Sequence, residues 1–128
     1  MMTPSSLMDA LGIETKTISR DKVCLTMEVT DAVKQPMGFL HGGASVALAE
    51  TAASIGGLQH IDQNCQTIVG IEINCNHIKA KKDGIVQGIA TPIHIGRTTM
   101  IWQIEILDEK DKKIAVSRCT LGVMDIAK

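Results

Sequence analysis

Residues 41–59 read HGGASVALAETAASIGGLQ and combine a strong helix pattern with one residue that a buried helix disfavours. Their side chains are almost all small or aliphatic and lie around the whole helical circumference. This pattern predicts a helix over 42–58 that is buried on every side. Within that helix only Glu50 ionises. Because an unpartnered buried carboxylate costs several kcal/mol, we expect the protein either to use this side chain or to satisfy it.

The composition is that of one globular domain, which we expect to span residues 1–128. Hydrophobic residues make up 45% of the chain and charged residues 21%, as in ordinary soluble proteins. A net charge of -1 argues against a nucleic-acid partner or an anionic membrane surface. No apolar run approaches the length of about 18 residues that a membrane span needs, so neither a span nor a signal peptide is expected.

The cysteine and histidine spacings argue against a metal site. The four cysteines form no CxxC pair and the four histidines no HxxxH or HxH pair. We therefore expect free thiols, a cytoplasmic location, and a protein that needs neither a metal nor a separate cofactor. The residues concerned are Cys24, Cys65, Cys75, Cys119, His41, His60, His77 and His94.

The rest of the chain is dominated by strand patterns. We predict a short helix over 5–11, a loop over 30–40, and strands over 13–18, 22–29, 67–79, 84–95, 98–107 and 113–124. Tight turns between the last four strands predict an antiparallel meander. The long helix would span roughly 25 Å and carries many small residues, so the sheet can curve closely around it. The predicted fold class is α+β, with a curved antiparallel sheet wrapped around one central helix.

This order of elements resembles the hotdog fold. The helix region also resembles the PaaI-like acyl-CoA thioesterases of the 4-hydroxybenzoyl-CoA and 1,4-dihydroxy-2-naphthoyl-CoA type, over about residues 10–125. The acid eight residues after the first glycine makes the motif more specific than HGG alone. The residues that carry the resemblance are Gln35, His41, Gly42, Gly43, Glu50 and Ser54.

The resemblance implies a role for each of these side chains. Glu50 would act on the thioester as a nucleophile or as a general base. The Gly42 N–H, unpaired at the positive end of the helix, would donate to the oxygen on which charge develops. Gln35 and His41 would flank the same carbonyl. Ser54, one turn beyond Glu50, would hold the carboxylate or the attacking water.

Helix geometry requires more than one chain for this chemistry. Gly42 and Glu50 lie eight residues apart, about 12 Å along one helix, which is too far to hold one carbonyl group. The resemblance implies a two-fold homodimer with antiparallel helices, in which the Glu50 of one subunit faces the Gly42 of the other. Two such dimers would form a homotetramer, as is common among relatives.

The remaining substrate contacts are carried over from the same resemblance. His77 would line the acyl pocket, and Gly43 would contact the substrate beside the oxygen-binding N–H. Basic residues near the strand turns are the candidates for the CoA phosphates or the pantetheine arm. These are Lys79, Lys81, Lys82 and Arg97, with Thr98 beside the last.

Each of these residues also has a purely structural interpretation. Glu50 would then pair with a lysine or with backbone amides, and His41 would cap the helix. Gln35 would brace the loop, and Ser54 would donate to a helix carbonyl. The lysines at 79–82 would form a solvated turn.

The sequence thus predicts an enzyme that hydrolyses an aryl or short- to medium-chain acyl-CoA to the free acid and CoA. One alternative is a hotdog module that binds or senses acyl-CoA without cleaving it. Another is a hotdog dehydratase that acts on a 3-hydroxyacyl thioester, although those enzymes place a catalytic histidine differently relative to the helix acid.

Overall fold

The computed structural model describes residues 6–126. The elements are α1 (Leu7–Leu11), β1 (Ile13–Ile18), β2 (Val23–Glu28), the 3-10 turn η1 (Asp31–Val33), α2 (Gly42–Leu58), β3 (Gln66–His77), β4 (Ile85–Ile95), β5 (Thr99–Leu107) and β6 (Lys113–Asp125). The predicted bounds of α2 are confirmed, and each predicted strand is present within two residues of its expected ends. Among the described residues, no helix has the length and apolar character needed to cross a membrane.

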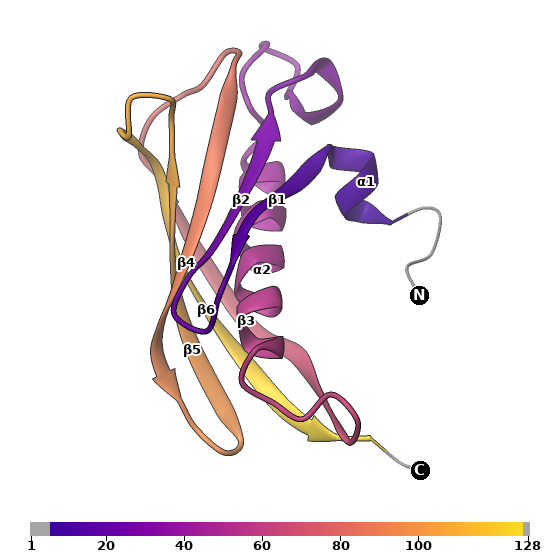
Figure 1. Cartoon of the computed structure of the whole chain (residues 1–128). Helices are drawn as coiled ribbons and strands as arrows, with labels where there is room; N and C mark the ends of the chain where they lie inside the picture. The colour runs from indigo at the N-terminus through magenta and orange to yellow at the C-terminus, as the bar shows by residue number, and fades with distance from the viewer. Residues whose placement is uncertain (1–5, 127–128) are drawn as a thin grey trace.

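All six strands form one antiparallel sheet in the order β1-β2-β4-β5-β6-β3 (Figure 1). Strands β4, β5 and β6 form the predicted meander. The predicted meander also included β3 as the neighbour of β4. That pairing was wrong, because β3 pairs with β6 at the edge of the sheet. The connection over 78–84 instead carries the chain from this edge to a position between β2 and β5.

Helix α2 packs along the concave side of the sheet with one face only (Figure 1). The buried face consists almost entirely of small residues: Ala44, Ser45, Leu48, Ala49, Ala52, Ala53, Gly56 and Gly57. The opposite face of the helix is half-exposed, so the prediction of burial on every side was wrong for the single chain. The sheet covers only the side that it touches, and the outer face remains open to another partner.

Trp102 on β5 shows why the buried face must be small. It is the largest fully buried side chain, and its ring lies directly against Gly56. A Cβ atom added at Gly56 would lie 2.6 Å from Cη2 of that ring. Because a rigid indole in a close-packed core cannot move away cheaply, glycine sets how closely α2 approaches the sheet.

Helix α1 lies on the outer side of α2 (Figure 1). The Ser6 hydroxyl accepts a hydrogen bond from the Asp9 N–H and caps this helix, and Gly12, with a φ of 72°, ends it in a left-handed turn. Residue 5, where the helix was predicted to begin, lies outside the described residues. Met8 packs against the core, whereas Leu7 is exposed.

We predict that Gly56→Ala destabilises the fold by about 1–3 kcal/mol, because the new methyl group overpacks the contact with Trp102. Urea denaturation measures this as a lower midpoint. Ser54→Ala, on the open face of the same helix, is the matched control and changes the free energy of unfolding by less than about 0.5 kcal/mol. Equal effects of the two substitutions would contradict this account of the packing.

Candidate functional site

The start of α2 offers an unused backbone donor. The Nδ1 atom of His41 accepts a hydrogen bond of 2.8 Å from the Gly43 N–H, and the His41 carbonyl accepts one from the Ala44 N–H. The Gly42 N–H donates to no acceptor within residues 6–126. It therefore points its partial positive charge at whatever occupies the adjacent space. The cap interpretation of His41 is thus correct, and its predicted role beside a substrate carbonyl stays a prediction.

His77 lies directly over Gly42. Its Nε2 atom would be 2.9 Å from a Cβ atom added at Gly42, so only glycine leaves room for the ring. The structure places the His77 imidazole at the amino end of α2, and its predicted role in an acyl pocket stays a prediction. Any group that accepts a hydrogen bond from the Gly42 N–H will therefore lie close to this ring.

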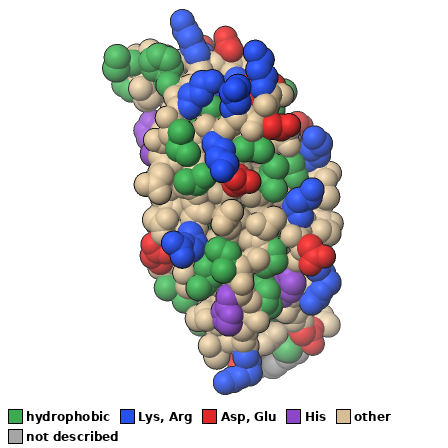
Figure 2. Space-filling model, turned by 90° about the vertical axis from the view of Figure 1, so that its left-hand side faces the viewer, with side chains coloured by type: hydrophobic (Ala, Val, Ile, Leu, Met, Phe, Trp, Pro, Cys, Tyr) green, Lys and Arg blue, Asp and Glu red, His purple; other side chains and the backbone are tan. Residues whose placement is uncertain are grey.

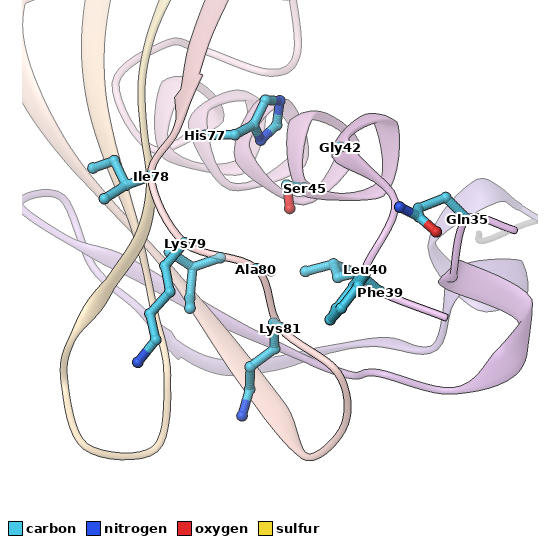
Figure 3. Close-up of a pocket in the computed structure, with 11 residues that line it drawn as sticks. Gln35, Phe39, Leu40, Gly42, Ser45, His77, Ile78, Lys79, Ala80 and Lys81 are labelled. Atoms are coloured by element: carbon cyan, nitrogen blue, oxygen red, sulfur yellow. The ribbon is translucent and has the colours of Figure 1, made fainter. Parts of the chain in front are cut away.

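A cavity of about 360 Å³ opens beside Gly42 (Figure 3). Its lining includes Gln35, Phe39, Leu40, Gly42, Ser45, His77 and Lys81. The Gln35 Oε1 atom accepts a hydrogen bond from the Met37 N–H, which braces the loop, while its amide nitrogen points toward the cavity. The Ser45 hydroxyl also points into this space. Sequence reasoning missed Ser45, although its position one turn after Gly42 was a usable signal.

A second cavity, of about 570 Å³, lies over the outer face of α2. Its lining includes Gly43, Glu50 and Ser54 together with the aliphatic side chains of Leu7, Met8, Val46, Ile55 and Leu58. Within residues 6–126 the Glu50 carboxylate makes no hydrogen bond or ion pair, and neither does the Ser54 hydroxyl. The hydroxyl that donates to a helix carbonyl is that of Thr51, at 2.6 Å from the Ala47 oxygen. The structural interpretations of Glu50 and Ser54 therefore find no support in this chain.

The predicted catalytic residues, apart from His41, and the predicted pocket residue His77 are thus divided between two cavities of one chain. Gln35, Gly42 and His77 border the first cavity, whereas Glu50 and Ser54 border the second. An eight-residue separation along α2 places Gly42 and Glu50 about 12 Å apart along the helix axis. One thioester carbonyl therefore cannot contact both Gly42 and Glu50 of the same chain.

Comparison with known proteins identifies the family. The family model described as "Thioesterase superfamily" matches residues 37–115, which include α2 and strands β3 to β5. This chain belongs to the thioesterase superfamily. As a member of it, the protein is a thioester hydrolase with the hotdog fold, as the sequence predicted.

Individual relatives are similar to this thioesterase in sequence or structure over nearly the whole chain. A Bacillus subtilis protein provisionally named as an esterase, ComA2, is 51% identical over 93% of this chain and 94% of its own. A 1,4-dihydroxy-2-naphthoyl-CoA hydrolase from Listeria monocytogenes is 45% identical over 91% of this chain and 94% of its own. The crystal structure of a Haemophilus influenzae thioesterase superposes with a TM-score of 0.93 at 42% identity, over 98% of this chain and 87% of that one.

The cysteine whose pKa Glu50 influences, Cys119, is not activated. Burial raises the pKa of the Cys119 thiol to about 12, and the negative charges of Glu50 and Glu72 add to this shift. A thiol with so high a pKa stays protonated at neutral pH and is a poor nucleophile. The predicted role of Glu50 in the chemistry stays a prediction, and Cys119 offers no reactive thiolate beside it.

The lysines of the β3–β4 connection differ in how they are paired. Lys79 lies 3.8 Å from Asp108, and Lys81 pairs with Glu109, whose other oxygen accepts a hydrogen bond from the Ile85 N–H. Within residues 6–126, Lys82 has no carboxylate partner. Figure 2 shows Lys and Arg side chains gathered at the end of the molecule where the β3–β4 and β5–β6 connections meet.

Arg97 and Thr98 lie at the other end of this thioesterase. Both are exposed in the β4–β5 turn, whereas Lys82 precedes the start of β4. The length of β4 separates these positions by roughly 30 Å. Within one chain, the predicted substrate-binding residues Arg97 and Thr98 therefore form no group with Lys82 and His77.

We predict that Glu109 contributes to the stability of the fold in a way that depends on acid, through its contacts with Lys81 and Ile85 in and beside the β3–β4 connection. Its hydrogen bond with Lys81 and the one from the Ile85 N–H lower the pKa of Glu109 from 4.5 to about 2. Because the pKa is lower in the folded state, the stabilisation is present above pH 4.5 and is lost as the pH falls toward 2. The free energy of unfolding should therefore differ most between the wild type and Glu109→Gln at neutral pH, and the two should converge near pH 2. A difference that is constant across this range would contradict the assignment.

Proposed function

We propose that this thioesterase hydrolyses an aryl or short- to medium-chain acyl-CoA to the free acid and CoA. Two relatives, 45% and 40% identical, are named as 1,4-dihydroxy-2-naphthoyl-CoA hydrolases. The single observation that supports the chemistry best is Glu50, an unpaired carboxylate in a largely aliphatic cavity. Such surroundings strengthen the interaction of a carboxylate with a thioester carbonyl or with the attacking water.

The proposed reaction consumes only water and the thioester, without a metal ion or a separate cofactor. In one route the Glu50 carboxylate attacks the carbonyl carbon, CoA leaves as the thiolate, and water hydrolyses the resulting anhydride. In the other route Glu50 takes a proton from water, the water oxygen attacks the carbonyl carbon, and the C–S bond breaks with CoA leaving as the thiolate. In both routes the Gly42 N–H stabilises the negative charge on the carbonyl oxygen.

The proposed active site is completed by a second copy of the chain. Glu50 and Ser54 of one subunit would face Gln35, His41 and Gly42 of the other, across a two-fold axis. The division of these residues between two cavities supports this arrangement, as does the half-exposed outer face of α2. Two such dimers would form the homotetramer.

We assign the acyl group to the aliphatic second cavity. We assign the nucleotide end of CoA to a lysine-rich rim, by which we mean Lys79, Lys81 and Lys82 of the β3–β4 connection. Lys82 is the candidate phosphate contact on this rim, since its two neighbouring lysines already pair with carboxylates. His77 and Gly43 would contact the substrate near the thioester. Arg97 and Thr98 would then contact a CoA molecule that is bound mainly by another subunit.

We also propose that the reaction takes place in the cytoplasm. All four cysteines, Cys24, Cys65, Cys75 and Cys119, are free thiols in the structure. Free thiols at several positions suit a reducing compartment.

The test is thiol release from a panel of aryl and aliphatic acyl-CoA substrates. We predict that Glu50→Gln lowers kcat by about 10²–10⁴-fold, the range for removal of a general acid-base group, while KM changes little. Glu14→Gln, which alters an exposed carboxylate on β1, is the control and retains full activity.

Three outcomes would contradict the proposal. An active Glu50→Gln variant would remove Glu50 from the chemistry. Binding of acyl-CoA without thiol release would indicate a sensor, and an enoyl product without free thiol would indicate a dehydratase.

A further inference from the structure

Gly70 on β3 lies directly beneath the Glu50 carboxylate. A Cβ atom added at Gly70 would overlap the Oε2 atom of Glu50 and would lie 3.6 Å from Cδ of the same carboxyl group. Apart from the two chain neighbours of Gly70, no other described residue comes within 4 Å of that added atom. The Glu50 carboxylate therefore packs directly against the Gly70 backbone, and a methyl group at position 70 would collide with this carboxylate.

Backbone conformation does not explain the glycine at this position. Among the described residues, the glycines with positive φ are Gly12, Gly38 and Gly84, and Gly70 is not one of them. Alanine can therefore adopt the backbone conformation of Gly70 without strain. What requires glycine is the space that the carboxylate occupies.

A β-bulge follows immediately in the strand. In the pairing with β6, Gly70 faces Leu121 and Glu72 faces Thr120, so Ile71 is the extra residue. In a regular strand, residues seven apart point to opposite faces. Because of the bulge, both Gly70 and His77 face α2, the first against Glu50 and the second against Gly42.

We propose that Gly70 is a positioning residue that sets the location of the Glu50 carboxylate, an inference that rests on the proposed function. Glu50 is half-exposed and borders the second cavity, so its side chain can move aside without unfolding the protein. A methyl group at position 70 displaces the carboxylate by on the order of 1 Å, and a misplacement of that size can cost about 10²-fold in rate.

The experiment measures thiol release by Gly70→Ala, Glu50→Asp and the double variant. We expect Gly70→Ala to lower kcat by about 10–10²-fold with KM within about twofold of the wild type. An aspartate at position 50 is one methylene shorter, so its carboxylate does not reach Gly70. Adding Gly70→Ala to Glu50→Asp should therefore cause almost no further loss of kcat. A merely structural role would lower the rate by the same factor in both backgrounds.

Gly122→Ala is the matched control on the neighbouring strand β6. Its added Cβ atom would crowd the apolar tips of Ile71, at 3.0 Å, and Val69, at 3.3 Å, and would not touch Glu50. It should retain the kcat of the wild type. The inference is overturned if Gly70→Ala keeps full kcat while Glu50→Gln is inactive, or if Gly122→Ala loses as much kcat as Gly70→Ala. Full activity of Glu50→Gln would overturn the proposed function itself.

Discussion

The close packing of α2 against the sheet is the interaction on which the rest of the structure depends. Contacts such as that between Gly56 and Trp102 hold the helix as a rigid rod with one face buried. A rigid rod fixes the positions of Gly42 and Glu50, about 12 Å apart along its axis. The same helix therefore contributes a hydrogen-bond donor to one cavity and a carboxylate to another. In the proposed dimer, each helix would serve two active sites.

Local patterns predicted the bounds of the helix, its unpaired first N–H and its unpartnered acid correctly. The bounds of α2 follow from an unbroken run of small and aliphatic residues after HGG, and the free Gly42 N–H follows from the geometry of any helix start. The lone acid of that run, Glu50, does lie without a partner in the described chain. These features depend on neighbours within a few residues, which is why a single sequence reveals them.

Features that depend on distant residues were missed. The turn residues after β3 suggested that β3 pairs with β4. Its partner is instead β6, which lies far along the chain, so no local pattern indicates this pairing. The alternation of apolar and polar residues along β3 does not reveal the bulge at Ile71. Because the bulge decides which face of the sheet His77 points to, the contact between His77 and Gly42 was not predicted. The helix composition suggested burial on every side, because a sequence shows that a helix face is apolar but not which neighbour covers it.

The most direct test of the central claim mixes two inactive variants, Glu50→Ala and Gln35→Ala, after unfolding and refolding them together. If each site takes Glu50 from one subunit and Gln35 from the other, roughly half of the dimers are mixed and each of these regains one intact site. Activity should then return to about a quarter of the wild-type value. If both residues act within one subunit, every site in the mixture still carries one defect. Activity that stays at the level of the two separate variants would therefore contradict the account.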